Sequence, residues 1–359
     1  MPTTSENITG YSVARSLRWE DGELMILDQT LLPGEIVENR QETIEQVWDA
    51  IKQLRVRGAP AIGVAGAYGL LVGIRPFRQR PLAEFLAILK EKAAYLNSSR
   101  PTAVNLGWSL KRMTDFAESQ LGRVADAAQL HERLVEEACR IHAEDRAICR
   151  AIGENGLELI RAGSGVLTHC NAGALATSEL GTATAPLYLA HARGIGFRVY
   201  ADETRPLLQG ARLTTWELQR AGVDVTLICD SMAASVMSQG LIDLCIVGCD
   251  RVAANGDMAN KIGTLGVAIL ARHFNIPFYV ACPSSTVDLG TACGDDIVIE
   301  EREAEEVLFC GARRTAPEGA KVRNPAFDVT PHQLVSGFIT DRGIIRPPFA
   351  SDTLARIFG

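Results

Sequence analysis

Aromatic residues are scarce in this chain, at 6% of its 359 residues, whereas it holds 32 glycines and is 47% hydrophobic. That balance is typical of α/β proteins in which helices and turns pack closely through small side chains. The length exceeds what one core usually supports, so we expect two domains, or one large α/β domain with an N-terminal addition. The hydrophobic content excludes a disordered chain.

The sequence has no block of basic residues, and its formal net charge is -7. Such a field repels nucleic acid, although a local basic pocket for a small anion remains open. The first residues, MPTTSENITGYSV, show neither a basic patch before an apolar stretch nor an Arg-rich amphipathic pattern, so export is not indicated. The longest uncharged run lies between Arg57 and Arg75 and reads better as a buried helix than as a membrane span.

The nine cysteines form no CxxC pair and no regular framework. An odd number of cysteines in a chain with a sizeable core indicates reduced thiols and a cytoplasmic location, with most of them serving as small core residues.

Several cofactor and nucleophile motifs are also missing. The run RGAPAIGVAGAYG has neither the GxGxxG spacing of a dinucleotide fingerprint nor the GK[ST] ending of a P-loop, and its glycines at 63, 66 and 69 fit a close helix-packing face. No cluster has zinc spacing, and no GxSxG elbow occurs. We therefore expect no metal and no cofactor.

Periodicity divides the chain in two. Residues up to about 35 alternate apolar and polar around Asp21 and Gly22, which predicts a small antiparallel hairpin, and the next hundred residues have helical spacing. From about 163, short β-rich runs alternate with helical stretches, as in a parallel doubly wound sheet. The expected fold is α/β, with a mainly helical domain carrying a small sheet over 1–135 and a Rossmann-like domain over 136–359.

Ligands of such sheets bind beyond the carboxyl ends of the strands. The chemistry-bearing residues at these ends are Cys170, Asp202, Glu203, Asp230, Ser231, Asp250 and Cys282.

Cys170 lies in THCNAGALAT, directly after a predicted strand and before small residues that allow backbone N–H groups to approach it. That setting lowers a thiol pKa, but a buried structural thiol remains open. We interpret His169 as structural, because adjacent strand residues point to opposite faces.

Asp250 closes the run LCIVGCD, where it can act as a general acid or base in a dry pocket, cap the next turn or pair with Arg251. Asn260 and Lys261 lie just before a predicted helix and suit hydroxyl and phosphate groups.

Arg57 precedes Gly58, Ala59 and a helix-starting Pro60, so a guanidinium and free N–H groups can converge on one anion. Arg100 lies in SSRPTAVNLGW, which alone is a weak signal of an exposed loop, and Gln209 lies in DETRPLLQGARLT, either a surface helix start or the rim of a polar pocket. The segment RNPAFDVTP, with Asp328, indicates a structural turn or a site closure.

Seven segments in order, ILDQTLLP, RGAPAIGVAGAYG, SRPTAVNLGW, THCNAGALAT, DETRPLLQGARLT, VGCDRVAANGDMANKIGT and NPAFDVTP, resemble the methylthioribose-1-phosphate isomerase family, which includes regulatory subunits of initiation factor 2B. The resemblance runs from about residue 10 to 349. It implies a helical domain joined to a Rossmann-like domain, usually as a homodimer.

The resemblance also implies conversion of 5-methylthioribose 1-phosphate to 5-methylthioribulose 1-phosphate in methionine salvage. Cys170 and Asp250 match the catalytic pair of the family. The positions that match the substrate-binding residues of the family are Arg57, Gly58, Ala59, Arg100, Gln209, Asn260 and Lys261. Two alternatives stay open: an isomerase of 5-deoxyribose 1-phosphate or ribose 1,5-bisphosphate, and a regulatory subunit without turnover.

Overall fold

A computed structural model describes residues 13–101, 103–349 and 351–358. The N-terminal segment MPTTSENITGYSV, from which we predicted that the chain has no export signal, lies mostly outside these residues. Contacts divide the described chain into two compact units. Unit 1 holds Val13–Ile148 and Ala174–Gly181, and unit 2 holds Cys149–Gly173 and the residues from Thr182 onward. The expected boundary at 135 falls inside the continuous helix α5 (Ala127–Gly156), so no linker separates two domains there.

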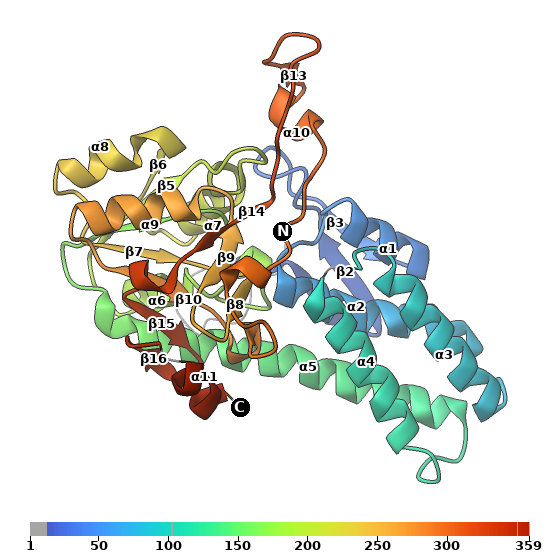
Figure 1. Ribbon diagram of the computed structural model, residues 1–359. Helices are drawn as coiled ribbons and strands as arrows, with labels where there is room; N and C mark the ends of the chain where they lie inside the picture. The colour runs from blue at the N-terminus through green and yellow to red at the C-terminus, as the bar shows by residue number, and fades with distance from the viewer. Residues whose placement is uncertain (1–12, 102, 350, 359) are drawn as a thin grey trace. The chain divides into compact units, whose positions relative to one another are not determined.

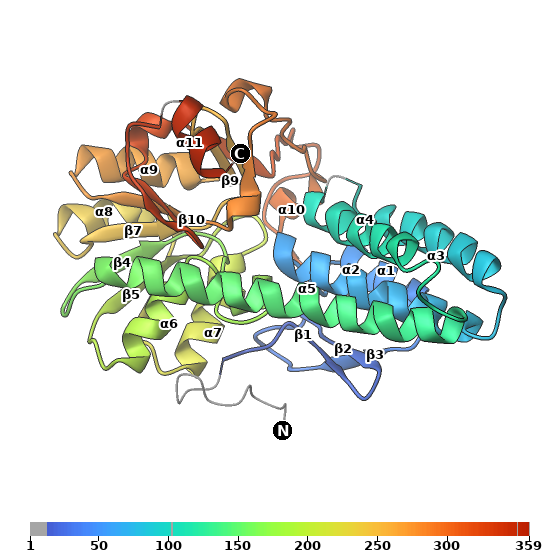
Figure 2. The ribbon, with the colours of Figure 1, turned by 90° about the horizontal axis from the view of Figure 1, so that it is seen from below.

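Unit 1 is mainly helical and carries one three-stranded antiparallel sheet, in the order β1-β2-β3, with the predicted turn at Asp21 and Gly22 between β1 and β2 (Figures 1 and 2). Its elements, with the first part of α5, are β1 (Leu17–Glu20), β2 (Glu23–Leu27), β3 (Glu38–Gln41), α1 (Ile44–Lys52), α2 (Ala59–Ile74), α3 (Leu82–Asn97) and α4 (Val104–Ser119).

Helix α2 is the core of unit 1. Together with the following turn to Phe77 it is long and apolar enough to cross a membrane, but 78% of the tested window is buried inside the structure, as in a core helix. Gly63 and Gly66 face Asn105 and Leu106 of α4, and Gly69 faces Val47 of α1, so the predicted close-packing face is confirmed. Tyr68 stacks on Trp19 of β1 with ring centroids 4.9 Å apart, which fixes the sheet against the helix.

Unit 2 contains a seven-stranded sheet in the order β16-β15-β10-β7-β4-β5-β6 (Figure 1). All neighbouring pairs are parallel except β15 and β16, so the predicted parallel sheet gains one antiparallel edge strand. The strands are β4 (Gly165–Thr168), β5 (Arg198–Asp202), β6 (Val225–Ile228), β7 (Leu244–Val247), β10 (Phe278–Ala281), β15 (Gly337–Thr340) and β16 (Gly343–Ile345), and the helices are α6 (Ala185–Ala192), α7 (Thr215–Arg220), α8 (Ala233–Ser238), α9 (Thr264–His273) and α11 (Ser351–Phe358).

A second sheet of four strands follows β7, in the order β11-β8-β9-β14. Its members are β8 (Arg251–Ala253), β9 (Met258–Lys261), β11 (Val287–Asp288) and β14 (Phe327–Thr330). Asn260 and Lys261, which the sequence analysis placed just before a helix, lie on β9, and β9 pairs with β8 on one side and with β14 on the other. Beyond this sheet a short helix, α10 (Glu305–Leu308), leads into a projecting hairpin of β12 (Phe309–Cys310) and β13 (Arg313–Arg314) (Figure 1).

Candidate active site

Cys170 follows β4 and has a left-handed backbone, with φ of 65°. Two threonine side chains hold it there. The Cys170 N–H donates to Thr204 Oγ1 at 2.8 Å, and the Thr214 hydroxyl donates to the Cys170 carbonyl at 2.6 Å. A residue other than glycine in this conformation costs about 1–3 kcal/mol and persists only where its surroundings impose it, which is common at functional sites.

Thr204 is itself part of a loop held by polar contacts. Its hydroxyl donates to the Asp202 carbonyl at 3.0 Å, and its N–H donates to Asp230 Oδ1 at 2.8 Å. The Arg205 N–H donates to the other oxygen of Asp230, also at 2.8 Å. Asp230 at the end of β6 therefore anchors the loop after β5, and that loop anchors Cys170.

His169 is buried, and both of its ring nitrogens are engaged. Nδ1 lies 2.9 Å from Asp202 Oδ2, and Nε2 lies 2.9 Å from the carbonyl oxygen of Ile262. The expectation that His169 is structural and no partner of the Cys170 thiol agrees with these contacts. Burial opposes the imidazolium form, but the Asp202 carboxylate and the Ile262 carbonyl outweigh it and raise the pKa of His169.

His169, Asp202 and Asp230 place one ligand atom each within 4.8 Å of one another. These residue types fit a divalent metal ion, but the hydrogen bonds do not. A carbonyl oxygen can only accept, so His169 Nε2 carries a proton, and Nδ1 is taken by Asp202. No ring lone pair points to a shared ion, so this cluster is a hydrogen-bonded network.

The end of β5 and the segment that follows it hold two buried side-chain oxygens for which the described residues supply no donor. Gln209 is 6% exposed and Asp202 is 1% exposed. Gln209 Oε1 and Asp202 Oδ1 have no hydrogen-bond partner among the residues that the structure describes. An unpaired buried acceptor costs about 1–3 kcal/mol, so Gln209 Oε1 is a natural acceptor for a ligand hydroxyl.

Asn260 and Lys261 lie on β9, before the turn that leads into α9. Asn260 is buried, and its amide donates to Thr264 Oγ1 at 3.0 Å. The Lys261 ammonium donates to the Ala326 carbonyl at 3.1 Å and lies 4.7 Å from the centre of the Phe327 ring. These contacts hold both side chains in defined positions.

Asp328 closes the N-terminus of α9. Its carboxylate accepts from the Gly263 N–H at 2.7 Å and from the Leu265 N–H at 3.1 Å. The N–H groups of Gly263 and Leu265 at this helix start are therefore occupied by a side chain. These two hydrogen bonds give Asp328 a structural role at this end of the helix.

Asp250 comes after β7, as predicted, and its N–H donates to the Ala259 carbonyl at 2.9 Å. Its side chain is exposed, so the dry pocket expected around it is not present in the structure. Cys282, another of the residues expected at a strand end, is buried, and burial raises the pKa of its thiol to about 12. Cys282 is thus a packing residue.

The candidates Arg57, Gly58, Ala59 and Arg100 belong to unit 1. Gly58 caps α2 with φ of 90°, and a Cβ at this position would overlap the backbone of Ala176. The segment around Ala176 follows the Cys170 loop in the chain and is held in unit 1 by Ser16 Oγ, which donates to the Thr177 carbonyl at 2.9 Å, and by Gln29 Nε2, which donates to the Leu175 carbonyl at 2.8 Å. Gly58 is required by this close approach.

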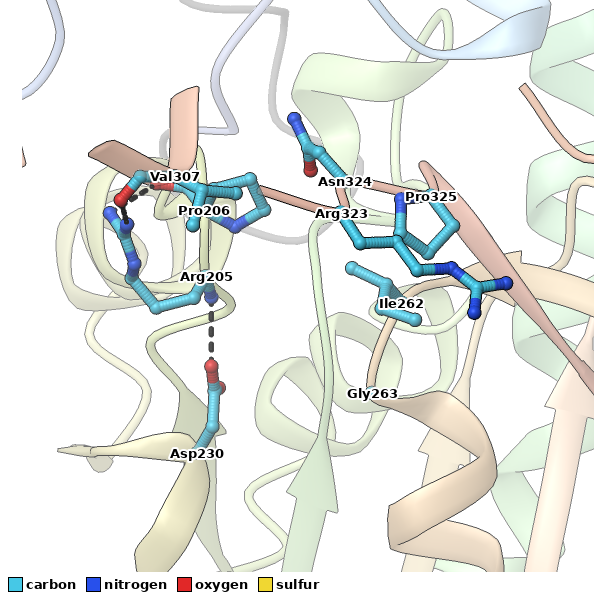
Figure 3. A pocket seen from close by; sticks show the side chains of 9 residues that line it. All are labelled: Arg205, Pro206, Asp230, Ile262, Gly263, Val307, Arg323, Asn324 and Pro325. Atoms are coloured by element: carbon cyan, nitrogen blue, oxygen red, sulfur yellow. Dashed lines mark hydrogen bonds between the residues drawn. The ribbon is translucent and has the colours of Figure 1, made fainter. Parts of the chain in front are cut away.

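A pocket of about 270 Å³ opens in unit 2 beside the Asp230 anchor. Figure 3 shows the guanidinium groups of Arg205 and Arg323 on opposite sides of it. The Arg205 guanidinium is bound to backbone carbonyls, at 2.9 Å from Val307 O and 3.1 Å from Phe309 O. Ile262, Pro206 and Pro325 supply apolar walls, and Asp230, Arg323 and Asn324 supply polar ones.

Sequence reasoning missed Thr204 and Thr214, which hold Cys170. Both lie in the segment DETRPLLQGARLT, but a threonine after a strand carries no local signal of a tertiary hydrogen bond.

Three comparisons relate the chain to known proteins. Residues 55–347 match the model of the initiation factor 2 subunit family. A Bacillus anthracis protein named 5-deoxyribose 1-phosphate isomerase is 57% identical over 342 residues, which cover 95% of this chain and 98% of the relative.

Two solved structures have similar folds. The crystal structure of 5-methylthioribose 1-phosphate isomerase from Pyrococcus horikoshii OT3 has a TM-score of 0.91 and 42% identity, and the match covers 97% of each chain. The crystal structure of translation initiation factor eIF-2B, subunit delta, from A. fulgidus has a TM-score of 0.87 and 44% identity, over 95% of this chain and 99% of that one.

Proposed function

Because the chain belongs to the initiation factor 2 subunit family, in which relatives more than half identical to it are named isomerases, we propose that it is an aldose–ketose isomerase of a ribose 1-phosphate. The observation that carries the proposal is the strained Cys170, held by Thr204 and Thr214 beyond the carboxyl end of β4. That is where ligands of parallel sheets bind.

The reaction needs no external oxidant or reductant. The C2–H bond breaks and a C1–H bond forms, the bond from C1 to the ring oxygen breaks, and the ring oxygen gains the proton that the C2 hydroxyl loses. Two groups of different acidity suit this exchange. Asp250 moves the proton between the C2 hydroxyl and the ring oxygen, and Cys170 assists at the carbon centre.

The other site residues orient the substrate. Gln209 Oε1, which is buried and has no donor, accepts a sugar hydroxyl. Asn260 and Lys261 contact hydroxyl and phosphate oxygens, and Arg57 and Arg100 bind the phosphate through charge-assisted hydrogen bonds. Holding reacting groups in place in this manner supplies a large part of an enzyme's rate.

The substrate we favour is 5-deoxyribose 1-phosphate, because the curated relatives more than half identical to this chain carry that name. The second candidate is 5-methylthioribose 1-phosphate, which the seven motifs lead us to expect and after which the Pyrococcus enzyme is named; it would place the enzyme in methionine salvage. Both have a neutral C5 substituent, which requires no second group of cations beside the one that binds the C1 phosphate. Ribose 1,5-bisphosphate needs further cations to bind its second phosphate, and the seven motifs show no additional basic cluster.

A substrate panel tests the proposal. The purified protein is given 5-deoxyribose, 5-methylthioribose and ribose 1-phosphates with the C5 group as the only variable, together with ribose 1,5-bisphosphate, and ketose formation is followed. We expect kcat/KM to be highest for the 5-deoxy compound and lowest for the bisphosphate. Turnover of none of the four, with tight binding of any, would identify a regulatory subunit instead. The homodimer and the cytoplasmic location remain predictions.

A further inference from the structure

His169 links three segments that are distant in the sequence. It directly precedes Cys170, its Nδ1 contacts Asp202 at the end of β5, and its Nε2 contacts the carbonyl of Ile262 in the turn after β9. The ring also packs on Gly263, where φ is 105° and where a Cβ would lie 2.8 Å from Cε1 and 2.9 Å from Nε2. The turn and the imidazole therefore fit together closely, and Gly263 is needed for that fit.

The hydrogen bonds of this ring define its protons. The Ile262 carbonyl is only an acceptor, so Nε2 always carries a hydrogen. One further proton lies between Nδ1 and Asp202 Oδ2, either on the ring or on the carboxyl group, and the pair has no net charge in either case. The His169 and Asp202 side chains are 2% and 1% exposed, and this neutral, fully bonded pair avoids the cost of an isolated buried charge.

We propose that His169 is a positioning residue of the isomerase: bonded to Asp202 and to the Ile262 carbonyl, it holds the turn that follows Asn260 and Lys261 in register with the strand end that carries Cys170. The inference rests on the proposed function for its catalytic consequence. Its geometric part stands on the two 2.9 Å contacts and the Gly263 packing alone.

Both Asp202→Asn and Asp202→Ala remove the carboxylate, but only asparagine can still form a hydrogen bond with His169 Nδ1. Comparing the two variants therefore tests whether the hydrogen bond that positions the ring matters, apart from the charge of the carboxylate. An asparagine amide can donate to the unprotonated Nδ1 of a neutral ring, and its oxygen can take the place of Asp202 Oδ1, which already has no partner. Asp202→Asn thus keeps the ring in place, whereas Asp202→Ala frees it. We expect kcat of Asp202→Asn within about threefold of wild type and kcat of Asp202→Ala lower by about 10- to 100-fold, since small misplacements in a site cost that much.

His142→Asn is the matched control. His142 is also buried and belongs to unit 1. Its Nδ1 lies 3.0 Å from the hydroxyl of Tyr68, which is not one of the candidate site residues. We expect His169→Asn to lower kcat by about 10- to 100-fold and His142→Asn to leave kcat unchanged in the folded protein. Equal losses in both variants, or equal rates in Asp202→Asn and Asp202→Ala, would overturn the proposal.

Nitrogen-15 NMR of the histidine side chains tests the geometry without any substrate. In wild type we expect a protonated His169 Nε2 across pH 6–9 and an Nδ1 signal that changes from a shared proton to a neutral acceptor in Asp202→Asn. An unprotonated Nε2 contradicts the proposal. If the wild type converts none of the sugar phosphates while these signals are as expected, the proposed function fails and the hydrogen-bonded link stands.

Discussion

Replacement of Gly58 by alanine tests how unit 1 holds the segment after Cys170. Gly58 has φ of 90°, and the added Cβ would overlap the backbone of Ala176. Gly122, in a loop of the same unit, has φ of 78° but no heavy atom within 4 Å of an added Cβ. Both positions have a positive φ, which disfavours alanine, but only at Gly58 would the added Cβ also overlap another part of the chain.

A positive φ costs alanine about 1–2 kcal/mol or more relative to glycine. Overpacking against a backbone that cannot move away adds about 1–3 kcal/mol. We expect urea unfolding to show a loss of about 1–2 kcal/mol for Gly122→Ala and about 2–5 kcal/mol for Gly58→Ala. The KM for the sugar phosphate should also rise in Gly58→Ala alone. Equal losses of stability in the two variants would refute the close approach of Gly58 to Ala176.

Three further outcomes follow from contacts in unit 2. The pKa of His169 is raised by Asp202 and the pKa of Asp202 is raised by burial, with Asp230, Glu203 and Asp328 nearby, so the folded pair holds one proton more firmly than the unfolded chain. The contribution of this pair to the free energy of unfolding is therefore complete below the pKa of an unfolded histidine and falls as pH rises, by up to about 1.4 kcal/mol per pH unit. Urea unfolding of Asp202→Asn at a series of pH values should not show this decrease. Gln209→Leu removes a buried acceptor without a donor and should leave the unfolding free energy within about 1 kcal/mol of wild type while raising KM about tenfold or more; a loss of stability with unchanged KM would contradict the role of Gln209. Arg205→Ala removes the donors to Val307 and Phe309, so limited proteolysis should cut around the β12–β13 hairpin faster than in wild type, and an unchanged rate would show that these bonds do not hold the segment.

The main elements could be predicted because their signals are local. The alternation around Asp21 and Gly22 gave the β1–β2 hairpin, and helical spacing gave the helices of unit 1. The second sheet of unit 2 was missed, since β9 contains Asn260 and Lys261 and becomes a strand only through pairing with β8 and β14.

The site shows the same division. The position of Cys170 beyond a parallel strand was confirmed, since an apolar run followed by small residues marks a strand end. The conformation of Cys170 was not predictable, because it depends on Thr204 and Thr214. The contact of His169 with Ile262 likewise joins residues far apart in the chain. The exposure of Asp250 is also set by tertiary packing and not by the apolar strand before it.

The most direct test of the account is turnover of 5-deoxyribose 1-phosphate and 5-methylthioribose 1-phosphate by wild type, Cys170→Ala and Asp250→Asn, with Cys310→Ser as a control for an exposed thiol elsewhere. The account predicts ketose formation by wild type and Cys310→Ser, and a fall of about 100-fold or more in kcat for each of the two site variants, with circular dichroism unchanged. Full activity in Cys170→Ala would show that Cys170 is only a packing residue. Binding without turnover by the wild type would contradict the proposal that the protein is an isomerase.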